Sequence, residues 1–276
     1  MIPSAAGRPG TSLGDGFEVT EGTTLIGDPI PIGVAVVYRG EPIVDDGWTA
    51  DLLVDGGDPL AIVETYLEQA ADAGLVPVVE PGCRADRGEG VVVCSGAARS
   101  LESSPPRSLT VEVVRGRRGD VYSDHVVVRY ATTELYWETP AVWYGGEPTT
   151  EVPDPQPWPT APNVGEPLGT AGETMTSVIV EEGSRLAGPT RLQLDDATGG
   201  VVAILEVTGD PASVLESYLD QLVARGLQTG EPEVRQIGDA TLTTAWAAES
   251  GGDGFQLSLV ERPERPVWLQ ISGSHD

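Results

Sequence analysis

The sequence contains no lysine: its 16 basic residues are all arginine, and they face 43 aspartates and glutamates, which gives a formal net charge of -27. The absence of lysine excludes the phosphate-binding lysine of P-loop proteins, the Schiff-base lysine of pyridoxal enzymes and the S-x-x-K motif of serine penicillin-binding enzymes. The excess of acid disfavours nucleic acid and an anionic membrane surface as partners. No stretch has the roughly 18 consecutive apolar residues that a membrane span requires.

Histidine and cysteine are also scarce, with two of each. Cys83 and Cys94 flank a turn-rich segment between apolar runs at 76–79 and 91–93, so we expect a hairpin disulfide that stabilises the first module by roughly 2 to 3 kcal/mol. A zinc site is the alternative, but neither C-x-x-C nor H-x-x-x-H spacing is present. The sequence therefore predicts no metal site and no cofactor.

A 19-residue segment occurs twice in the sequence. Gly57 to Leu75 reads GDPLAIVETYLEQAADAGL, and Gly209 to Leu227 reads GDPASVLESYLDQLVARGL, with nine identical positions. A chain of 276 residues is long enough for two domains, each with its own core. We infer a tandem duplication of one module.

Each copy of this segment has the pattern of an amphipathic helix with both ends marked. An aspartate at the N-cap, Asp58 or Asp210, is followed by a proline at the first helical position, and Gly74 or Gly226 suits the left-handed residue that ends a helix. Apolar residues recur at helical spacing in both copies. The acidic residues near Asp58 do not form a D-x-D-x-D-G calcium loop, so capping is the better explanation.

Short β-rich runs surround each predicted helix. In the first module they lie at 34–38, 48–54, 76–79, 91–95, 109–115 and 125–130, and in the second at 191–194, 201–207, 232–237, 240–246, 255–260 and 267–271. Alternation of apolar and polar residues within several runs indicates strands with one face in a core. The predicted fold class is α+β, with two repeated modules that each pack one long helix on one face of an antiparallel sheet.

The predicted organisation is a flexible leader at 1–16, a first module at 17–146, a proline-rich linker at 147–168 and a second module at 169–276. The leader contains G-T-S-L-G at Gly10 to Gly14, but the serine hydrolase elbow requires a strand before it and a helix after it, and neither is expected there. Seven of the 23 prolines lie between Glu147 and Leu168, a composition typical of a stiff, extended linker. The second module lacks about nine residues between its first strand and its helix, and we place the difference near residues 41–47.

Aromatic residues are concentrated at the end of the first module, in Tyr136, Trp137, Trp143 and Tyr144. One interpretation is that these rings pack the first module against the second or cover an edge of its sheet. The other is a partner-binding patch, since tryptophan and tyrosine dominate binding hot spots. These four are the candidate partner-binding residues.

The motifs G-[TS]-x-L-x-G and D-P-x-x-[IV]-[VL]-x-x-Y-x-x-Q-x-x-x-x-G occur in both modules. In this the sequence resembles tandem-module exported or membrane-anchored proteins of GC-rich Gram-positive bacteria, whose function is mostly unassigned. The scarcity of asparagine and lysine and the abundance of glycine, proline, alanine and valine also suggest a GC-rich genome. The resemblance implies an extracytoplasmic location and no catalytic residues.

The first 16 residues lack a charged region followed by an apolar one and so do not form a signal peptide. Either the protein is cytoplasmic, or the sequence begins downstream of a removed signal or anchor. The expected disulfide favours the second option, and we predict a protein that is secreted or anchored at the cell surface.

From the duplication, the linker and the aromatic residues we predict a noncatalytic module pair that binds a protein or cell-surface partner. The alternatives are a carrier of a small apolar ligand, with a pocket between helix and sheet, and a hydrolase that uses carboxylates. The acids are spread over helix faces and turns, while His125 lies at a strand edge and His275 is the penultimate residue. No catalytic residue is therefore assigned from the sequence.

Overall fold

The computed structural model describes most of the chain, and the ranges that it describes are 7–31, 35–38, 41–44, 47–85, 90–100, 107–118, 121–122, 124–132, 147–153, 162–169, 178–188, 190–193, 200–249 and 254–274. Its internal contacts divide it into two compact units. One comprises Ala6–Arg117 and Ser123–Gln156, and the other consists mainly of Pro157–Asp276. We call these the first and the second module, assign each strand to the sheet with which it pairs, and describe each module by itself.

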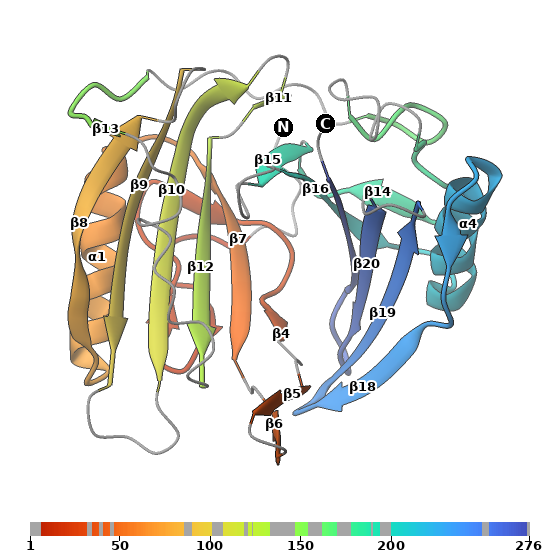
Figure 1. Cartoon of the computed structure of the whole chain (residues 1–276), viewed down its shortest axis with the longest axis horizontal. Helices are drawn as coiled ribbons and strands as arrows, with labels where there is room; N and C mark the ends of the chain where they lie inside the picture. The colour runs from red at the N-terminus through yellow and green to blue at the C-terminus, as the bar shows by residue number, and fades with distance from the viewer. Residues whose placement is uncertain are drawn as a thin grey trace. The chain divides into compact units, whose positions relative to one another are not determined.

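The first module is an antiparallel sheet with the strand order β13-β8-β9-β10-β12-β7-β3, to which β4 and β11 add short pairings with β7 and β10 (Figure 1). Its strands are β3 (Thr23–Leu25), β4 (Ile30–Pro31), β7 (Trp48–Val54), β8 (Val76–Ala85), β9 (Val91–Arg99), β10 (Ser108–Arg118), β11 (Val121–Tyr122), β12 (His125–Ala131) and β13 (Glu147–Pro148). Helix α1 (Pro59–Asp72) connects β7 to β8 and contacts β8 and β9.

The second module has the strand order β14-β16-β21-β20-β19-β17, with β15 paired to β16 and β18 paired to β19. Its strands are β14 (Ser184–Leu186), β15 (Arg191–Gln193), β16 (Gly200–Val207), β17 (Gln228–Thr229), β18 (Glu233–Ile237), β19 (Ala240–Ala248), β20 (Gly254–Glu261) and β21 (Val267–Ser274). Helix α4 (Pro211–Ala224) connects β16 to β17 and contacts β19 and β20. The prediction of an α+β fold is thus confirmed in its general form, because the sheets are antiparallel and each of them carries a helix.

Both helices begin as their sequences predict. The side chain of Asp58 accepts a hydrogen bond from the Leu60 amide at 3.0 Å, and that of Asp210 accepts one from the Ser213 amide at 2.9 Å. A proline follows at the first helical position in each case. The amide and hydroxyl of Ser213 hold the pKa of Asp210 below its usual value, so this cap stays ionised in moderately acidic solution. No helix in the described part of the chain is long and apolar enough to cross a membrane.

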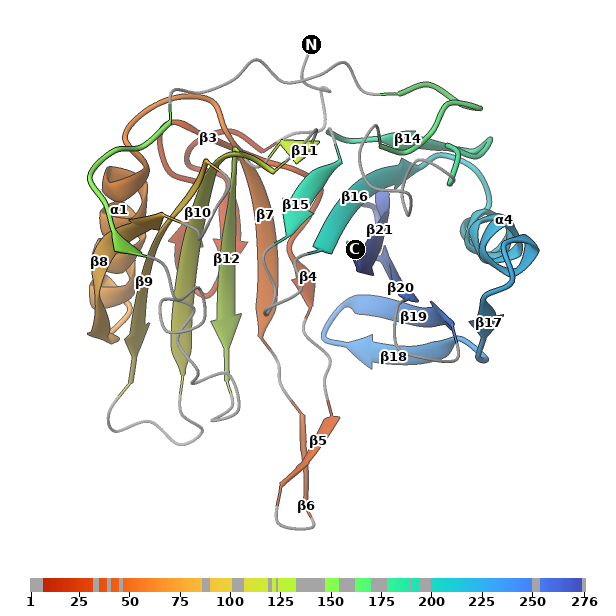
Figure 2. The same ribbon diagram turned by 45° about the horizontal axis from the view of Figure 1, so that its top comes forward.

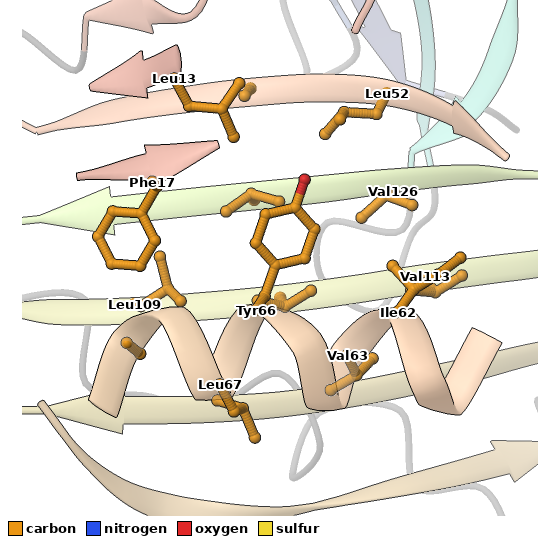
Figure 3. Packing of buried hydrophobic residues seen from close by; sticks show 14 of the residues in the cluster. Leu13, Phe17, Leu52, Ile62, Val63, Tyr66, Leu67, Leu109, Val113 and Val126 are labelled. Atoms are coloured by element: carbon orange, nitrogen blue, oxygen red, sulfur yellow. The ribbon is translucent and has the colours of Figure 1, made fainter. Parts of the chain in front are cut away.

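The apolar side of α1 packs on the sheet to form the core of the first module. Figure 3 shows Ile62, Val63, Tyr66 and Leu67 directed at side chains of the strands, which include Leu52, Leu109, Val113 and Val126. A side chain at Gly96 would meet Leu67 and Val63 at 2.9 Å, so glycine permits the close approach of helix and strand there. The structure thus fills the space between helix and sheet where a carrier of an apolar ligand would need its pocket.

Cys83 and Cys94 form the expected disulfide. They are paired residues on the adjacent strands β8 and β9, with α-carbons 3.9 Å apart. The two cysteines are therefore bonded to each other and do not serve as zinc ligands.

Part of the predicted leader is ordered against the first module. Strand β1 (Ser12–Gly14) pairs with β2 (Phe17–Glu18), and Leu13 is buried in the core. Ser12 lies on β1 rather than on a turn between a strand and a helix, so the elbow geometry of serine hydrolases is not formed.

Both ends of the predicted linker also belong to the modules. Strand β13 pairs with the edge of β8, and the Thr149 amide donates to the Cys83 carbonyl at 3.0 Å. At the other end Leu168 is fully buried, and its amide donates to the Val178 carbonyl at 2.7 Å. Proline does not prevent this pairing, because an edge strand needs donors on one side only.

Strands β5 (Ala35–Tyr38) and β6 (Glu41–Val44) form a separate hairpin between β4 and β7 (Figure 2). This hairpin falls in the region where the sequence of the first module is longer than that of the second. A surface hairpin is an insertion that leaves the core unchanged.

A set of side-chain contacts occurs in both modules at corresponding places. The Gln69 side chain accepts from the Glu18 amide at 2.9 Å and donates to the Glu18 carbonyl at 3.2 Å. Gln221 makes the same two bonds with Ile179, at 2.9 and 3.1 Å. In each module a helix residue thereby fixes the extended segment that precedes the first strand of the sheet.

A buried tyrosine lies in the middle of each helix. The Tyr218 hydroxyl accepts from the Glu181 amide at 3.1 Å and lies 2.8 Å from the Ser184 hydroxyl. The Tyr66 hydroxyl is directed toward Thr20 and Thr23 but makes no hydrogen bond of good geometry. Burial raises the pKa of both tyrosines, so both stay protonated at neutral pH.

Candidate functional site

Successive residues of a strand point to opposite sides of a sheet, so the strand register assigns every side chain to one of two faces. In the first module Leu52, Val113 and Val126 point toward α1. The residues between them point the other way. We call this opposite side the outer face of the first module.

Four charged or ionisable residues surround Val127 on this outer face. Val127 on β12 is directly paired with Asp51 on β7 and with Glu112 on β10. His125 and Arg129 lie two residues before and after Val127 on β12, and therefore on the same face. Two acidic and two basic side chains thus alternate around one apolar residue.

The spacing of a sheet brings each of these acids within reach of both bases. Diagonal neighbours on adjacent strands have α-carbons about 7 to 8 Å apart, a distance that long side chains span. Asp51 and Glu112 are each diagonal neighbours of His125 and of Arg129. All four residues have interaction partners in the structure.

The burial of these residues differs. His125 is 1% exposed and Asp51 8%, whereas Glu112 and Arg129 are half-buried. A charged or polar group at such low exposure is stabilised only when it is hydrogen-bonded or paired. By register His125 therefore lies diagonally between two acidic residues, and its own side chain is buried.

An imidazole held in this way can exchange a proton with a water molecule or with a leaving group, and a neighbouring carboxylate orients the ring and stabilises its protonated form. Ser95 is directly paired with Glu112 on the same face. It is two strands away from β12, a separation of about 10 Å between backbones. The register therefore places on this face a residue that can act as a general acid or base, His125, but it does not place a serine next to that histidine.

In the parts of the chain that the structure describes, no three His, Cys, Asp or Glu side chains are grouped closely enough to hold a metal ion. Asp51, Glu112 and His125 are spread over three strands. The register thus gives two acidic and two basic side chains on one face, and none of the described residues adds a metal ligand set to them.

A second charged pair lies beside the cluster but on the other side of the sheet. Arg115 on β10 and Asp124, which precedes β12, form an ion pair with 3.1 Å between Nε and Oδ1, and their side chains are 2% and 1% exposed. The Gly116 amide also donates to Asp124 Oδ1 at 3.1 Å, and Arg115 Nη2 donates to the Pro153 carbonyl at 3.2 Å. This pair fixes the start of β12 and so helps to position His125.

The structure and the sequence-based assignments overlap only in part. Tyr136, Trp137, Trp143 and Tyr144 lie outside the described residues. His125 was placed at a strand edge by sequence; in the structure it is the first residue of β12, and this strand lies between β10 and β7 in the sheet. The signal that would have identified the cluster is the alternation His125, Val127, Arg129 on one strand, combined with a register that the sequence does not reveal.

No protein-family model and no curated protein sequence matches the chain. Among solved structures, one described as a thioesterase from Novosphingobium aromaticivorans is 13% identical, with a TM-score of 0.19, and the match covers 99% of this chain and 98% of that one. An acyl-CoA thioesterase II from Mycobacterium marinum is 9% identical, with a TM-score of 0.14, over 82% and 93% of the two chains. The dehydratase domain from the terminal module of the rifamycin polyketide synthase is 13% identical, with a TM-score of 0.17, over 83% and 90%.

The solved structures named here are described as thioesterases and as a dehydratase domain, and the prediction of a noncatalytic module pair that binds a protein or cell-surface partner is therefore withdrawn. Likeness at these TM-scores transfers neither a fold nor an active site to this chain. The function is therefore inferred from the chain's own residues.

Proposed function

We propose that the first module is a hydrolase in which His125 acts as general base and acid on the outer face of the sheet. The observation that carries this proposal is the register that places His125 diagonally between Asp51 and Glu112. Of the alternatives considered from sequence, a hydrolase that uses carboxylates is the one that this cluster supports.

Acyl esters and thioesters are the substrate class that this chemistry fits. The cluster offers neither a serine beside the histidine nor a grouped set of metal ligands, so the nucleophile is a water molecule. The His125 imidazole accepts a proton from water as its oxygen attacks the acyl carbonyl, and the resulting imidazolium returns the proton to the departing alkoxide or thiolate. Esters and thioesters have good leaving groups and activated carbonyls, so they need less assistance than amides.

The charged neighbours of His125 have distinct roles in this scheme. Asp51 and Glu112 orient the ring and stabilise the imidazolium that forms during the reaction. Arg129, on the other side of Val127, balances the negative charge of the two carboxylates. The overall cluster thus carries two acids against two bases.

Replacing His125 with glutamine is expected to reduce kcat/KM for p-nitrophenyl butyrate or butyryl-CoA by roughly 100-fold to 10,000-fold, the usual contribution of a general acid–base group. Product release is followed spectrophotometrically.

The matched control is Glu64→Gln, since Glu64 is exposed on the side of α1 that faces away from the sheet. It should hydrolyse both substrates at the wild-type rate. Circular dichroism is the measurement that checks whether the His125→Gln variant is folded. Wild-type protein that does not exceed the uncatalysed rate, or a folded His125→Gln that keeps full activity, would refute the proposal.

We further propose that the two modules are copies of one ancestral module, as the sequence repeat suggests. The corresponding contacts of Gln69 and Gln221 support this, as do the capping of both helices by aspartate and the buried tyrosine in each. The catalytic cluster is confined to the first copy. By strand register, the places of His125 and Glu112 are taken in the second copy by Trp268 and Ser258.

Corresponding roles for the two glutamines predict a loss in each module. Gln69→Ala and Gln221→Ala should each lower the free energy of unfolding of their own module by about 1 to 2 kcal/mol, because each removes two hydrogen bonds to backbone groups. The loss for Gln221→Ala should be the larger, because Gln221 also donates to the Glu181 carboxylate at 2.5 Å. Urea unfolding of each variant measures the loss. The controls Glu68→Ala and Asp220→Ala, at exposed helix positions, should change it by less than about 0.5 kcal/mol. A loss in one module only would argue against copied architecture.

A further inference from the structure

The disulfide between Cys83 and Cys94 lies at the edge of the first module's sheet. Cys83 is on β8, which has β9 on one side and the two-residue strand β13 on the other (Figure 1). Cys94 is completely buried, whereas Cys83 is half-buried and follows the exposed Gly82, which has no side chain to cover it. Cys83 is therefore the sulfur that is more open to attack by a thiol in solution.

The end of β8 that contains the disulfide is a short ribbon. The pairing of β8 with β9 has register shifts between Pro77 and Val79 and between Val79 and Gly82. Pro77 and Pro81, which lie in this irregular stretch, also lack the amide that a strand uses in pairing. Beyond the shifts, residues 82–85 pair with β9 without interruption. A short ribbon at a sheet edge belongs to the parts of a fold that open most easily, so the covalent bond holds what the hydrogen bonds alone hold weakly.

The segment 147–153, which we call the strap, is attached to this ribbon. It begins with β13, which pairs with the last two residues of β8. The Thr149 amide donates to the Cys83 carbonyl at 3.0 Å, and Val152 packs against the core of the module. Opening the ribbon would remove both the strand partner and the carbonyl that hold the start of the strap.

The other end of the strap contacts the buried ion pair described above. Arg115 Nη2 donates to the Pro153 carbonyl at 3.2 Å, while Arg115 Nε pairs with Asp124 at 3.1 Å. The Gly116 amide donates to the same carboxylate at 3.1 Å. Asp124 directly precedes His125, the first residue of β12. A continuous series of contacts, the physical requirement for coupling between two places, thus runs from the disulfide through the strap to the residue before His125.

We propose that the Cys83–Cys94 disulfide is a redox-sensitive lock on the strap, and that its reduction releases the strap and lowers activity at His125. The second half of this statement rests on the function proposed above. Reduction by a dithiol proceeds by exchange, in which a thiolate of the reductant attacks the Cys83 sulfur and Cys94 leaves as a thiolate. The second thiol of the reductant then displaces Cys83. The protein gains two electrons and two protons, and the dithiol becomes a disulfide.

Release of the strap changes the surroundings of the buried ion pair. Arg115 loses the Pro153 carbonyl as an acceptor, and leaving a buried donor without its acceptor is costly. The ion pair then relaxes, and a shift of Asp124 moves His125. Misplacing a reacting group by about 1 Å can slow a reaction about 100-fold. The reduced protein should therefore hydrolyse its substrate about tenfold to 100-fold more slowly than the oxidised protein.

Hydrogen exchange of the full chain, followed by NMR before and after treatment with dithiothreitol, tests the lock without reference to activity. Reduction should accelerate exchange of the Thr149 and Gly116 amides at least about tenfold, because the strap holds the first directly and the second through the ion pair. The matched controls are the amides of Ile26 in the first module and Ala187 in the second, which donate to carbonyls elsewhere in the sheets. Both controls should keep their exchange rates.

Activity on p-nitrophenyl butyrate gives the second readout, measured after the reductant has been removed under nitrogen. The value of kcat/KM should fall about tenfold to 100-fold and return on reoxidation. The double variant Cys83→Ser, Cys94→Ser should have the lower rate with or without treatment by the reductant. Circular dichroism checks whether this variant keeps its sheets.

The lock is overturned if the Thr149 amide exchanges at one rate in both forms. It is also overturned if Ile26 accelerates as much as Thr149, since reduction then unfolds the module as a whole. The link to His125 is overturned if Thr149 accelerates while Gly116 does not, or if reduced wild type keeps the full rate of the oxidised form. If the oxidised wild type is inactive, the proposed hydrolase fails, while the exchange rates still decide on the lock.

Discussion

Replacing Asp124 with asparagine is expected to lower the free energy of unfolding of the first module by about 3 to 5 kcal/mol, the usual cost of removing one partner of a buried ion pair. Both side chains of the Arg115–Asp124 pair are almost inaccessible to water. The variant would leave the Arg115 guanidinium buried without its counter-charge. It would also weaken the acceptor for the Gly116 amide.

Urea unfolding followed by circular dichroism measures this loss, and two variants sharpen its interpretation. The double variant Arg115→Met, Asp124→Leu should recover much of the loss, because replacing both charges with apolar groups removes the unpaired charge. Glu233→Gln, in the exposed pair with Arg235, should cost less than about 1 kcal/mol. A loss for Asp124→Asn as small as that for Glu233→Gln would show that the buried pair does not stabilise the module.

Local patterns were sufficient to predict the regular elements. The aspartate caps and the following prolines specify where α1 and α4 begin, and these signals act within one turn of the chain. Most strands were also expected near their observed positions. The disulfide was predicted because its cysteines flank one short hairpin, so that their pairing is again a local property.

Strand register could not be predicted, and the cluster around His125 depends on it. The repeated helix segments align with an offset of 152 residues, which sets Asp55 beside Val207. In the structure the amides of Asp55 and Thr208 donate to the equivalent carbonyls of Gly22 and Gly183, so the preceding strands align with an offset of 153. The first module has an additional residue between strand and helix. A slip of one residue moves every side chain to the other face, so the sequence alignment alone exchanges the core and the outer face.

The N-terminal segment differs from expectation for a different reason. Its abundance of glycine, serine and proline is typical of a flexible leader. Leu13 and Phe17 are nevertheless buried, because they complete an apolar surface that β7 and β12 provide. Composition indicates whether a segment is ordered when isolated. These residues, however, are ordered by contacts with residues more than 30 positions away.

Trp48 is the residue through which this segment is held. Its ring stacks on Tyr130, with centroids 5.8 Å apart, and meets Phe17 edge-on at 5.9 Å. Its Nε1 donates to the Asp15 carboxylate at 2.9 Å. Trp48 therefore connects the β1–β2 hairpin to the central strands by both apolar contact and a hydrogen bond.

Trp48→Ala is accordingly expected to lower the free energy of unfolding of the first module by about 3 to 5 kcal/mol, as for other large-to-small substitutions in a core. Trp48→Phe should cost less, because an aromatic ring remains against Tyr130 and only the bond to Asp15 is lost. Denaturant unfolding measures both, and Trp246→Ala, at an exposed tryptophan, is the control with little expected change. If Trp48→Ala unfolds like wild type while limited proteolysis still spares residues 7–18, the aromatic contacts are not what holds this segment on the sheet. If proteolysis removes that segment only from the variant, Trp48 is its anchor.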